Sequence, residues 1–375
     1  MVKVLRWICK KCDKKWIYPV ERCAYCRGKT EKQIGAKTKV IGVSQVFIPS
    51  PYHPITPYHI LILEDEHGNR MPKKTIKAYD IGDIYKDIPT NDEHAVSVVK
   101  IKYDAYEAMK EAIELIGGIR INPSAKILIK PGIIAKAYPY MAFNTTPKAM
   151  DALLKILIEK GANKENITVA EQSFFSTMGD LLPRSELMEV FEKYGVKFID
   201  LSKTEFEKKK IGEFEIEISK EMLNKDLIIN VPVMRTDLML GISGALENMT
   251  RVVSKNSFLE LQKEPIKAAQ AIGLLTTALP KYITIADSTI GMESNAPKMG
   301  VPAFLNMIMA SRDPVAIDKI FQEIGLLRKA EYIEAAGKMG IGETNIEKIK
   351  VVGNELKALQ RELKPACGSK LLKDK

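Results

Sequence analysis

Residues 124–171, SAKILIKPGIIAKAYPYMAFNTTPKAMDALLKILIEKGANKENITVAE, have the pattern of a strand, a helix and a second strand. The runs KILI and ITVA have the length and apolar content of short buried strands. The segment between them has apolar residues at helical spacing; Thr145 or Thr146 can cap it, Pro147 suits its first turn and Gly161 ends it. A helix between two such strands predicts parallel strands of one sheet.

The same alternation continues on both sides of this segment. Further strand-like runs are VSVVKI, GVKFIDL, DLIINVPV, KYITIADS and IEKIKVVG, with helix-like segments between several of them. This pattern predicts an α/β domain over residues 93–375, with a mainly parallel sheet and helices on both faces.

Charged residues stand at the ends of five predicted strands: Lys130, Glu171, Asp200, Arg235 and Asp287. In open α/β sheets, ligands bind outside the carboxyl ends of the strands, so we expect a polar cleft there. Lys130, Glu171 and Asp287 are the catalytic candidates. Glu171 or Asp287 would act as general base, with Lys130 or Arg235 as an electrostatic clamp. Each of these residues alone also fits a solvated loop charge or a helix cap.

The start of the helix that follows residue 146 is a candidate for anion binding. Polar side chains there lie beside free backbone N–H groups at the positive end of a helix. Simple capping explains either threonine equally well. The predicted anion-binding set comprises Lys130, Asn144, Thr145, Thr146, Arg235 and Asn248.

Composition and histidine content limit the chemistry. The chain has 375 residues, 46% of them apolar and 28% charged, and no apolar run of about eighteen residues, so we expect a soluble, cytoplasmic protein without a membrane segment. No histidine follows His94, which excludes Ser-His-Asp, Cys-His and histidine-metal catalysis by residues 95–375 alone. A divalent ion on Glu171, Asp287 and Glu293 is an alternative that needs no histidine.

Four cysteines near the N-terminus have the spacing C-x2-C-x10-C-x2-C. They are Cys9, Cys12, Cys23 and Cys26. Two such pairs can place four thiolates around one tetrahedral ion, which predicts a structural zinc site with no open coordination position. Iron is the alternative metal, and two disulfides are the alternative without metal.

The net charge of +10 is concentrated in residues 1–40, which hold twelve Lys or Arg against three acids. A basic segment of this kind can hold nucleic acid or the phosphates of a nucleotide-like cofactor such as coenzyme A. Trp7, Trp16 and Tyr25 interleave with the basic residues, as a base-stacking surface requires. The alternative is that these aromatic side chains form the small core of the ribbon.

Residues 39–88 contain short strand-like runs separated by turn signals, a pattern that fits a small barrel of the oligonucleotide/oligosaccharide-binding (OB) type. We therefore expect a zinc ribbon over residues 1–34, an OB-like β-barrel over 35–92 and the α/β domain over 93–375. Residues 7–88, from WICKKCDKKWIYPVERCAYCRGKT to IGDIYKD, resemble domain of unknown function 35. That resemblance implies a scaffold beside thiolase-like or hydroxymethylglutaryl-CoA-synthase-like proteins in archaea, with room for the pantetheine arm of an acyl-CoA.

Residues 126–352 resemble a second family. LIKPG, the helix after NTTP, DLIINVPVMRTD, GALENMTRVV, ITIADSTIGMESNAPKMGVP, ASRDPVAIDKI and KMGIGE recur in this order in domain of unknown function 362. The resemblance implies an α/β fold and no settled reaction. That family tends to have Lys-Thr-His and Lys-Asn where this chain has Arg235-Thr236-Asp237 and Glu247-Asn248. Only Cys367 lies in the predicted domain 93–375, which excludes an iron-sulphur cluster held by the second domain.

Three functions fit these observations. The first is a zinc-ribbon/OB protein that docks on a thiolase-like acyl-CoA enzyme while its α/β domain binds or modifies an anionic carboxylate or phosphate metabolite. The second is a nucleic-acid-binding protein that uses the basic segment. The third is a stand-alone enzyme or maturation factor that uses carboxylates and Lys or Arg in the α/β cleft.

Overall fold

The computed structural model describes residues 4–34, 37–48, 56–75, 78–85, 90–102, 104–262 and 265–367. The chain forms two compact units. The first, here called the N-terminal unit, comprises residues 1–90 with 352–359. The second, here called the main unit, comprises residues 91–351 with 360–375.

The N-terminal unit begins with a small three-stranded sheet. Its strands β1 (Leu5–Cys9), β2 (Lys15–Trp16) and β3 (Thr30–Ile34) are antiparallel, in the order β2-β1-β3. The turn after β1 carries Cys9 and Cys12, and the segment before β3 carries Cys23 and Cys26. We call residues 5–34 the ribbon. This arrangement fits the zinc ribbon predicted from the cysteine spacing.

A second antiparallel sheet follows in the N-terminal unit, formed by β4 (Thr38–Val46), β5 (Tyr58–Asp65) and β6 (Arg70–Thr75). Its buried face packs Val40, Leu61, Leu63 and Met71 against Tyr85. Alternating burial along β5 is the expected pattern of a sheet with one covered face. The described residues form a three-stranded sheet, which does not confirm the predicted OB-like barrel.

The main unit is built around one large sheet whose hydrogen-bonded order includes β10-β9-β8-β13-β16-β17-β7. Its strands are β7 (Val96–Lys100), β8 (Ile127–Pro131), β9 (Ile167–Glu171), β10 (Lys197–Asp200), β13 (Leu227–Val231), β14 (Val233–Asp237), β15 (Gly241–Ser243), β16 (Tyr282–Asn295) and β17 (Met299–Ser311). Strands β11 (Phe206–Ile211) and β12 (Phe214–Ser219) form a separate hairpin. The last strand, β18, is Val351–Gly353.

Strand direction changes across this sheet. Strands β10, β9, β8, β13 and β16 are parallel, as the sequence predicted. Strands β16 and β17 then form a long antiparallel hairpin, and β7 pairs antiparallel with β17. The sheet is therefore mixed, with the antiparallel part added by the hairpin of residues 282–311 and by β7.

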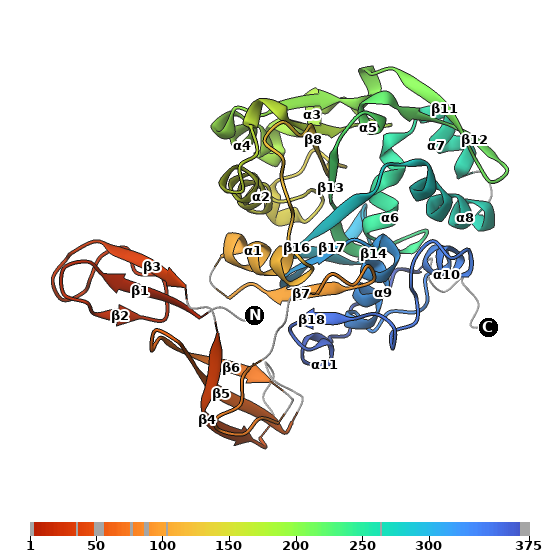
Figure 1. The fold of residues 1–375 in the computed structure, drawn as a ribbon. Helices are drawn as coiled ribbons and strands as arrows, with labels where there is room; N and C mark the ends of the chain where they lie inside the picture. The colour runs from red at the N-terminus through yellow and green to blue at the C-terminus, as the bar shows by residue number, and fades with distance from the viewer. Residues whose placement is uncertain are drawn as a thin grey trace. The chain divides into compact units, whose positions relative to one another are not determined.

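Helices cover the two faces of the sheet (Figure 1). One group contains α1 (Ala105–Leu115), α2 (Pro147–Glu159), α3 (Met178–Ser185) and α4 (Leu187–Tyr194). The other contains α6 (Ala245–Asn248), α7 (Lys255–Leu261), α8 (Pro265–Leu275), α9 (Pro314–Ile324) and α10 (Glu331–Lys338). The short helices are α5 (Lys220–Leu223), α11 (Leu356–Leu359), η1 (Pro139–Met141), η2 (Lys164–Asn166), η3 (Leu201–Lys203), η4 (Met249–Val252) and η5 (Thr276–Ala278).

Helix α2 shows how the sequence sets this architecture. Thr146 caps it through a hydrogen bond from the Ala149 amide, and Pro147 occupies its first turn. Its apolar residues are buried, including Met150, Leu153 and Leu157. No helix among the described residues is long and apolar enough to cross a membrane.

Candidate functional site

The four ribbon cysteines lie close together. Their sulfur atoms all lie within 4.8 Å of one another, with Cys9 to Cys26 and Cys26 to Cys12 at 3.3 Å and Cys12 to Cys23 at 3.5 Å. A disulfide has its sulfurs about 2.05 Å apart, so these are free thiols. A tetrahedral ion with Zn–S bonds of about 2.3 Å would separate its sulfurs by about 3.8 Å. The cysteines can therefore hold one metal ion with little movement.

Backbone amides favour the thiolate form of Cys9 and Cys23, whereas at Cys12 the neighbouring thiols outweigh the Lys14 amide and raise the pKa to about 12. The amides of Lys11 and Tyr25 donate to the sulfurs of Cys9 and Cys23, each at 3.3 Å. Burial opposes ionisation of Cys23, but amide and thiol hydrogen bonds outweigh it and lower its pKa to about 6. A Cβ on Gly28 would lie 3.0 Å from the Cys9 sulfur, so a larger residue here would push against a metal ligand. All four positions are filled by sulfur, which makes the site structural.

In the main unit, Lys130 at the end of β8 pairs with Glu171 at the end of β9. Nζ of Lys130 lies 2.8 Å from Oε2 of Glu171, and neither side chain is exposed. The ammonium also donates to the carbonyl of Pro131 at 3.2 Å. The carboxylate accepts the amides of Ile133 and Gln172. Burial raises the pKa of Glu171 and lowers that of Lys130.

Two buried asparagines continue this polar network toward α6. Asn248 Nδ2 donates to Asn230 Oδ1 at 2.7 Å, and Asn248 Oδ1 lies 3.5 Å from Lys130 Nζ. Asn230 Nδ2 in turn donates to the carbonyl of Ala245 at 2.9 Å. A Cβ on Gly132 would lie 3.1 Å from Asn248 Oδ1, so the loop after β8 approaches α6 closely. The network joins β8, β13 and α6 at the carboxyl ends of the parallel strands.

Groups of the protein itself occupy the predicted anion-binding position before α2. Asn144 binds the backbone of Ile134 and Ala135, and Thr145 Oγ1 donates to the carbonyl of Val231 at 2.7 Å. The Thr146 amide donates to Asp287 Oδ2 at 2.7 Å. The carboxylate that occupies this helix start is therefore Asp287.

Arg235 on β14 differs from these residues because its guanidinium is only partly paired. Its side chain is 6% exposed. Nη1 donates to the carbonyl of Phe143 at 3.2 Å, and Nη2 lies 4.0 Å from Glu247 Oε2, which is too long for a hydrogen bond. Nε is buried and has no hydrogen-bond partner. A buried cationic donor without an acceptor is costly unless a ligand supplies one.

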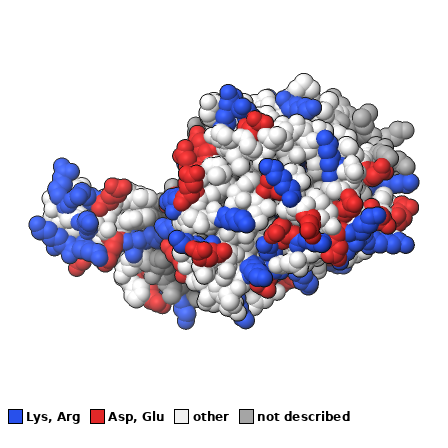
Figure 2. Space-filling model, turned by 90° about the horizontal axis from the view of Figure 1, so that it is seen from above, with Lys and Arg blue, Asp and Glu red and all other residues white. Residues whose placement is uncertain are grey.

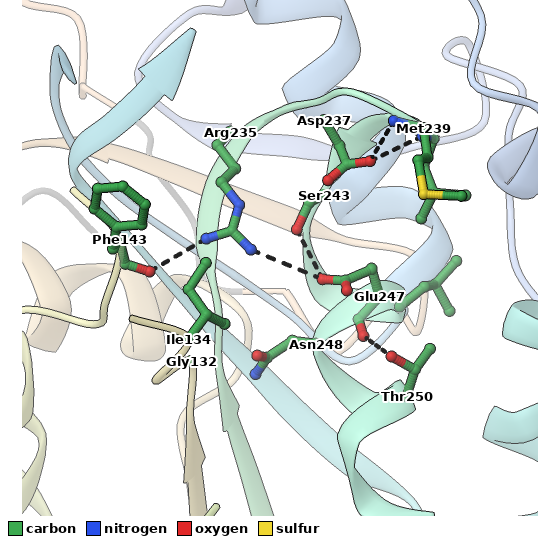
Figure 3. Close-up of polar contacts among 12 residues, drawn as sticks. Gly132, Ile134, Phe143, Arg235, Asp237, Met239, Ser243, Glu247, Asn248 and Thr250 are labelled. Atoms are coloured by element: carbon green, nitrogen blue, oxygen red, sulfur yellow. Dashed lines mark hydrogen bonds and ion pairs between the residues drawn. The ribbon is translucent and has the colours of Figure 1, made fainter. Parts of the chain in front are cut away.

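Two carboxylates lie beside this guanidinium (Figure 3). Glu247 on α6 accepts the Ser243 hydroxyl at 2.8 Å through Oε2. Asp237 at the end of β14 accepts the amides of Met239 and Leu240 at 2.9 Å through Oδ1. Burial and the Glu247 charge raise the pKa of Asp237, while these amides and Arg235 lower it. The site therefore presents groups of both signs.

The structure brings together most of the predicted site residues. Lys130, Glu171 and Asn248 belong to one hydrogen-bonded network, and Arg235 lies beside Glu247, which precedes Asn248 on α6. Asp287 is not at a strand end, because β16 continues to Asn295. Asp287 lies within β16, shortly after Thr284, the last residue of β16 that pairs with β13.

Asp200 does not join the predicted polar cleft, and Glu293 does not join the predicted divalent-ion site. Asp200 lies on edge strand β10 and caps η3 through the Ser202 amide. Glu293 lies in the β16–β17 hairpin and accepts the Lys364 amide. Among the described residues, only the ribbon cysteines bring three or more possible metal ligands together, so Glu171, Asp287 and Glu293 do not form a divalent-ion site.

Sequence reasoning missed Asn230 and Asp318. Asn230 interrupts the buried run of β13, and Asp318 interrupts the buried face of α9. Asp318 accepts the Ala245 and Leu246 amides at 2.6 and 3.1 Å and so holds the start of α6. A polar residue inside an apolar run was the available signal for both.

The chain is 20% identical over 265 residues to a thylakoid-associated protein of Synechocystis sp., with 67% of this chain and 82% of that protein covered. It is similar to the lactate racemase apoprotein of Thermoanaerobacterium thermosaccharolyticum, with 14% identity, a TM-score of 0.40, and 67% and 61% of the two chains covered.

A third similarity is to the Ltp2-ChsH2(DUF35) aldolase, with 18% identity and a TM-score of 0.18. It covers 21% of this chain and 66% of that one. The chain thus spans less than two thirds of the length of either solved structure. The profile of the domain of unknown function 362 (DUF362) matches residues 127–323, which is more than half of the sequence. The chain belongs to the DUF362 family.

Proposed function

We propose that the main unit binds a small anionic metabolite, a carboxylate or a phosphate, at Arg235. The observation that supports this proposal is the buried guanidinium whose Nε has no partner. Arginine presents its N–H groups as a planar fork that matches the two oxygens of a carboxylate or phosphate. Because Nη1 is held by Phe143, the guanidinium is already oriented before a ligand arrives.

The other candidate residues support this site without contacting the ligand. The Lys130 ammonium and the Glu171 carboxylate are fully buried and hydrogen-bonded to protein groups. Both oxygens of Asp287 accept backbone amides, from Thr146 and Thr289. We propose that these three residues fix the loop after β8 and the start of α2. This assignment favours binding over the stand-alone enzyme that uses them as acid, base or clamp.

A binding experiment tests the role of Arg235. The full chain would be titrated calorimetrically with malate, glycolate and inorganic phosphate. Arg235→Gln removes the cation, and Arg120→Gln removes an exposed cation of the same unit as a control. We expect at least a tenfold loss of affinity in the first variant and none in the second, because hydrogen bonds to charged groups contribute about 1.5–3 kcal/mol. Equal affinities of Arg235→Gln and the unaltered chain would overturn the proposal.

We further propose that the ribbon holds a structural zinc ion and docks, in the cytoplasm, on a thiolase-like acyl-CoA enzyme, with the region 35–92 forming an OB-like barrel. Support comes from the four-cysteine group and from the Lys and Arg side chains crowded on the ribbon surface (Figure 2). Tyr25 is 72% exposed, with the Lys14 ammonium 4.3 Å from its ring centre. Basic groups beside an exposed ring suit the phosphates and adenine of coenzyme A.

Nucleic acid is the competing partner for this basic surface. Its binding would weaken steeply with salt, because each neutralised phosphate releases counterions. The salt dependence of binding to single-stranded DNA and to coenzyme A would be compared for the full chain and for Tyr25→Ala. Tight, salt-steep DNA binding without coenzyme A binding would replace the docking proposal. Co-purification with a thiolase-like protein that is lost on zinc removal would support it.

A further inference from the structure

The charges around Arg235 do not suit a ligand that is only anionic. Glu247 and Asp237 lie on one side of the guanidinium (Figure 3), and the charge of Arg251 also acts on it. Two carboxylates and one further cation therefore act electrostatically on the guanidinium. An anion that binds Arg235 would lie close to two carboxylates that repel it, unless the ligand also carries a positive charge.

Groups of both charges near Arg235 also have hydrogen-bonding positions that the protein leaves unused. Among the described residues, no group donates to Oε1 of Glu247 or to Oδ2 of Asp237. On the donor side, Arg235 Nε is buried and unpartnered. The site thus offers one cationic donor and two carboxylate acceptors to whatever binds there.

We propose that the ligand of this site is an amino-carboxylate, whose carboxylate binds Arg235 and whose ammonium group binds Glu247 and Asp237. This inference rests on the proposed anion binding at Arg235 and adds the second charge. The ammonium supplies donors that match the free carboxylate oxygens. It also offsets the repulsion between Asp237 and Glu247, which together with burial raises the pKa of Asp237 in the free protein.

Matched pairs of ligands separate the two charges. Glycine and glycolate differ only in an amino group against a hydroxyl, as do aspartate and malate. Each would be titrated into the full chain, into Glu247→Gln and into Glu213→Gln, whose carboxylate is exposed in the turn between β11 and β12. We expect the unaltered chain and Glu213→Gln to bind each amino acid at least about tenfold more tightly than its hydroxy acid. Glu247→Gln should lose most of this preference, because the ammonium group would then face a neutral amide in place of a carboxylate.

The outcomes distinguish this inference from the proposal on which it depends. If neither member of a pair binds, anion binding at Arg235 fails and the inference fails with it. If both bind equally, or the hydroxy acid binds better, anion binding holds and the amino-carboxylate is wrong. If Glu247→Gln keeps the full preference, Glu247 does not contact the ammonium group. If Glu247→Gln binds nothing, Asp237→Asn decides, because its Oδ1 can keep both amide hydrogen bonds; an undiminished preference in that variant overturns the inference.

Discussion

Nζ of Lys130 lies 2.8 Å from Oε2 of Glu171, with both side chains completely buried. The two residues end neighbouring parallel strands, β8 and β9. Their pairing offsets part of the large cost of removing each charge from water. Lys130 also donates to the carbonyl of Pro131 and to Asn248 Oδ1, and Glu171 accepts the amides of Ile133, after β8, and Gln172, after β9. The pair therefore fixes the ends of β8 and β9 next to the candidate site.

Breaking this pair should destabilise the main unit strongly. Lys130→Met leaves the Glu171 carboxylate buried and unpaired, so we expect a loss of about 3–5 kcal/mol in the free energy of unfolding. The double variant Lys130→Met/Glu171→Leu should recover a large part of it. Urea unfolding followed by circular dichroism measures the free energy of unfolding of both variants. Tryptophan fluorescence would not serve, because Trp7 and Trp16 lie in the ribbon and do not report on the main unit. A double variant no more stable than the single one would contradict this account.

Asp318 should make the stability of the main unit depend on pH. Burial raises its pKa to about 7, although the Ala245 and Leu246 amides and the Tyr332 hydroxyl oppose the rise. A carboxyl group whose pKa is higher in the folded state stabilises the fold at low pH. That contribution is lost as pH rises from about 4 to about 7 and is constant above.

The Asp318→Asn variant isolates this contribution. Between pH 5 and pH 7.5 the unaltered chain should lose about 2 kcal/mol more unfolding free energy than the variant, since one pKa unit corresponds to about 1.4 kcal/mol. All other titrating groups are shared and cancel in the comparison. Parallel pH profiles for the two proteins would show that the Asp318 carboxyl has an ordinary pKa.

The ribbon should contain one zinc ion per chain. Cys12→Ser should lose the metal, whereas Cys367→Ser should keep it, because Cys367 is exposed and lies outside the four-cysteine group. Metal content measured by mass spectrometry tests this, and Trp fluorescence should report unfolding of the ribbon on chelation. Iron in place of zinc would correct the metal, and retention of metal by Cys12→Ser would rule out the four-cysteine site.

Gly28→Ala should weaken metal binding without removing any ligand. Its methyl group would lie 3.0 Å from the Cys9 sulfur and 3.4 Å from the Cys26 sulfur, so at least one sulfur must move. We expect at least about a tenfold loss of zinc affinity in competition with a chelator, comparable to the effect of changing groups that orient metal ligands. Unchanged affinity would mean that the turn relaxes to accommodate the methyl group.

Much of the main unit followed from local sequence rules. A threonine cap at position 145 or 146 and the buried runs of β8 and β9 were predicted because their signals are local, and Thr146 is the cap. The antiparallel hairpin β16–β17 was not, because apolar runs do not reveal the direction in which strands pair. The expected barrel over 35–92 stays a prediction.

The candidate site was only partly predictable for a related reason. Residues at strand ends were good candidates, since parallel strands end at one edge of a sheet. Their roles depend on which side chains remain unpaired, and that follows only from the three-dimensional contacts. Lys130 and Asp287 turned out to be hydrogen-bonded within the protein, whereas Arg235 kept a free donor.

The most direct test of the account is the NMR signal of the Arg235 Nε–H group. It would be assigned by its absence in Arg235→Lys and followed while malate and then aspartate are titrated into the full chain. We predict that this signal shifts saturably with the same dissociation constant that calorimetry gives, while the signal of exposed Arg120 stays fixed. Saturable ligand binding that leaves the Arg235 signal unmoved would contradict the central claim that Arg235 binds the anionic group.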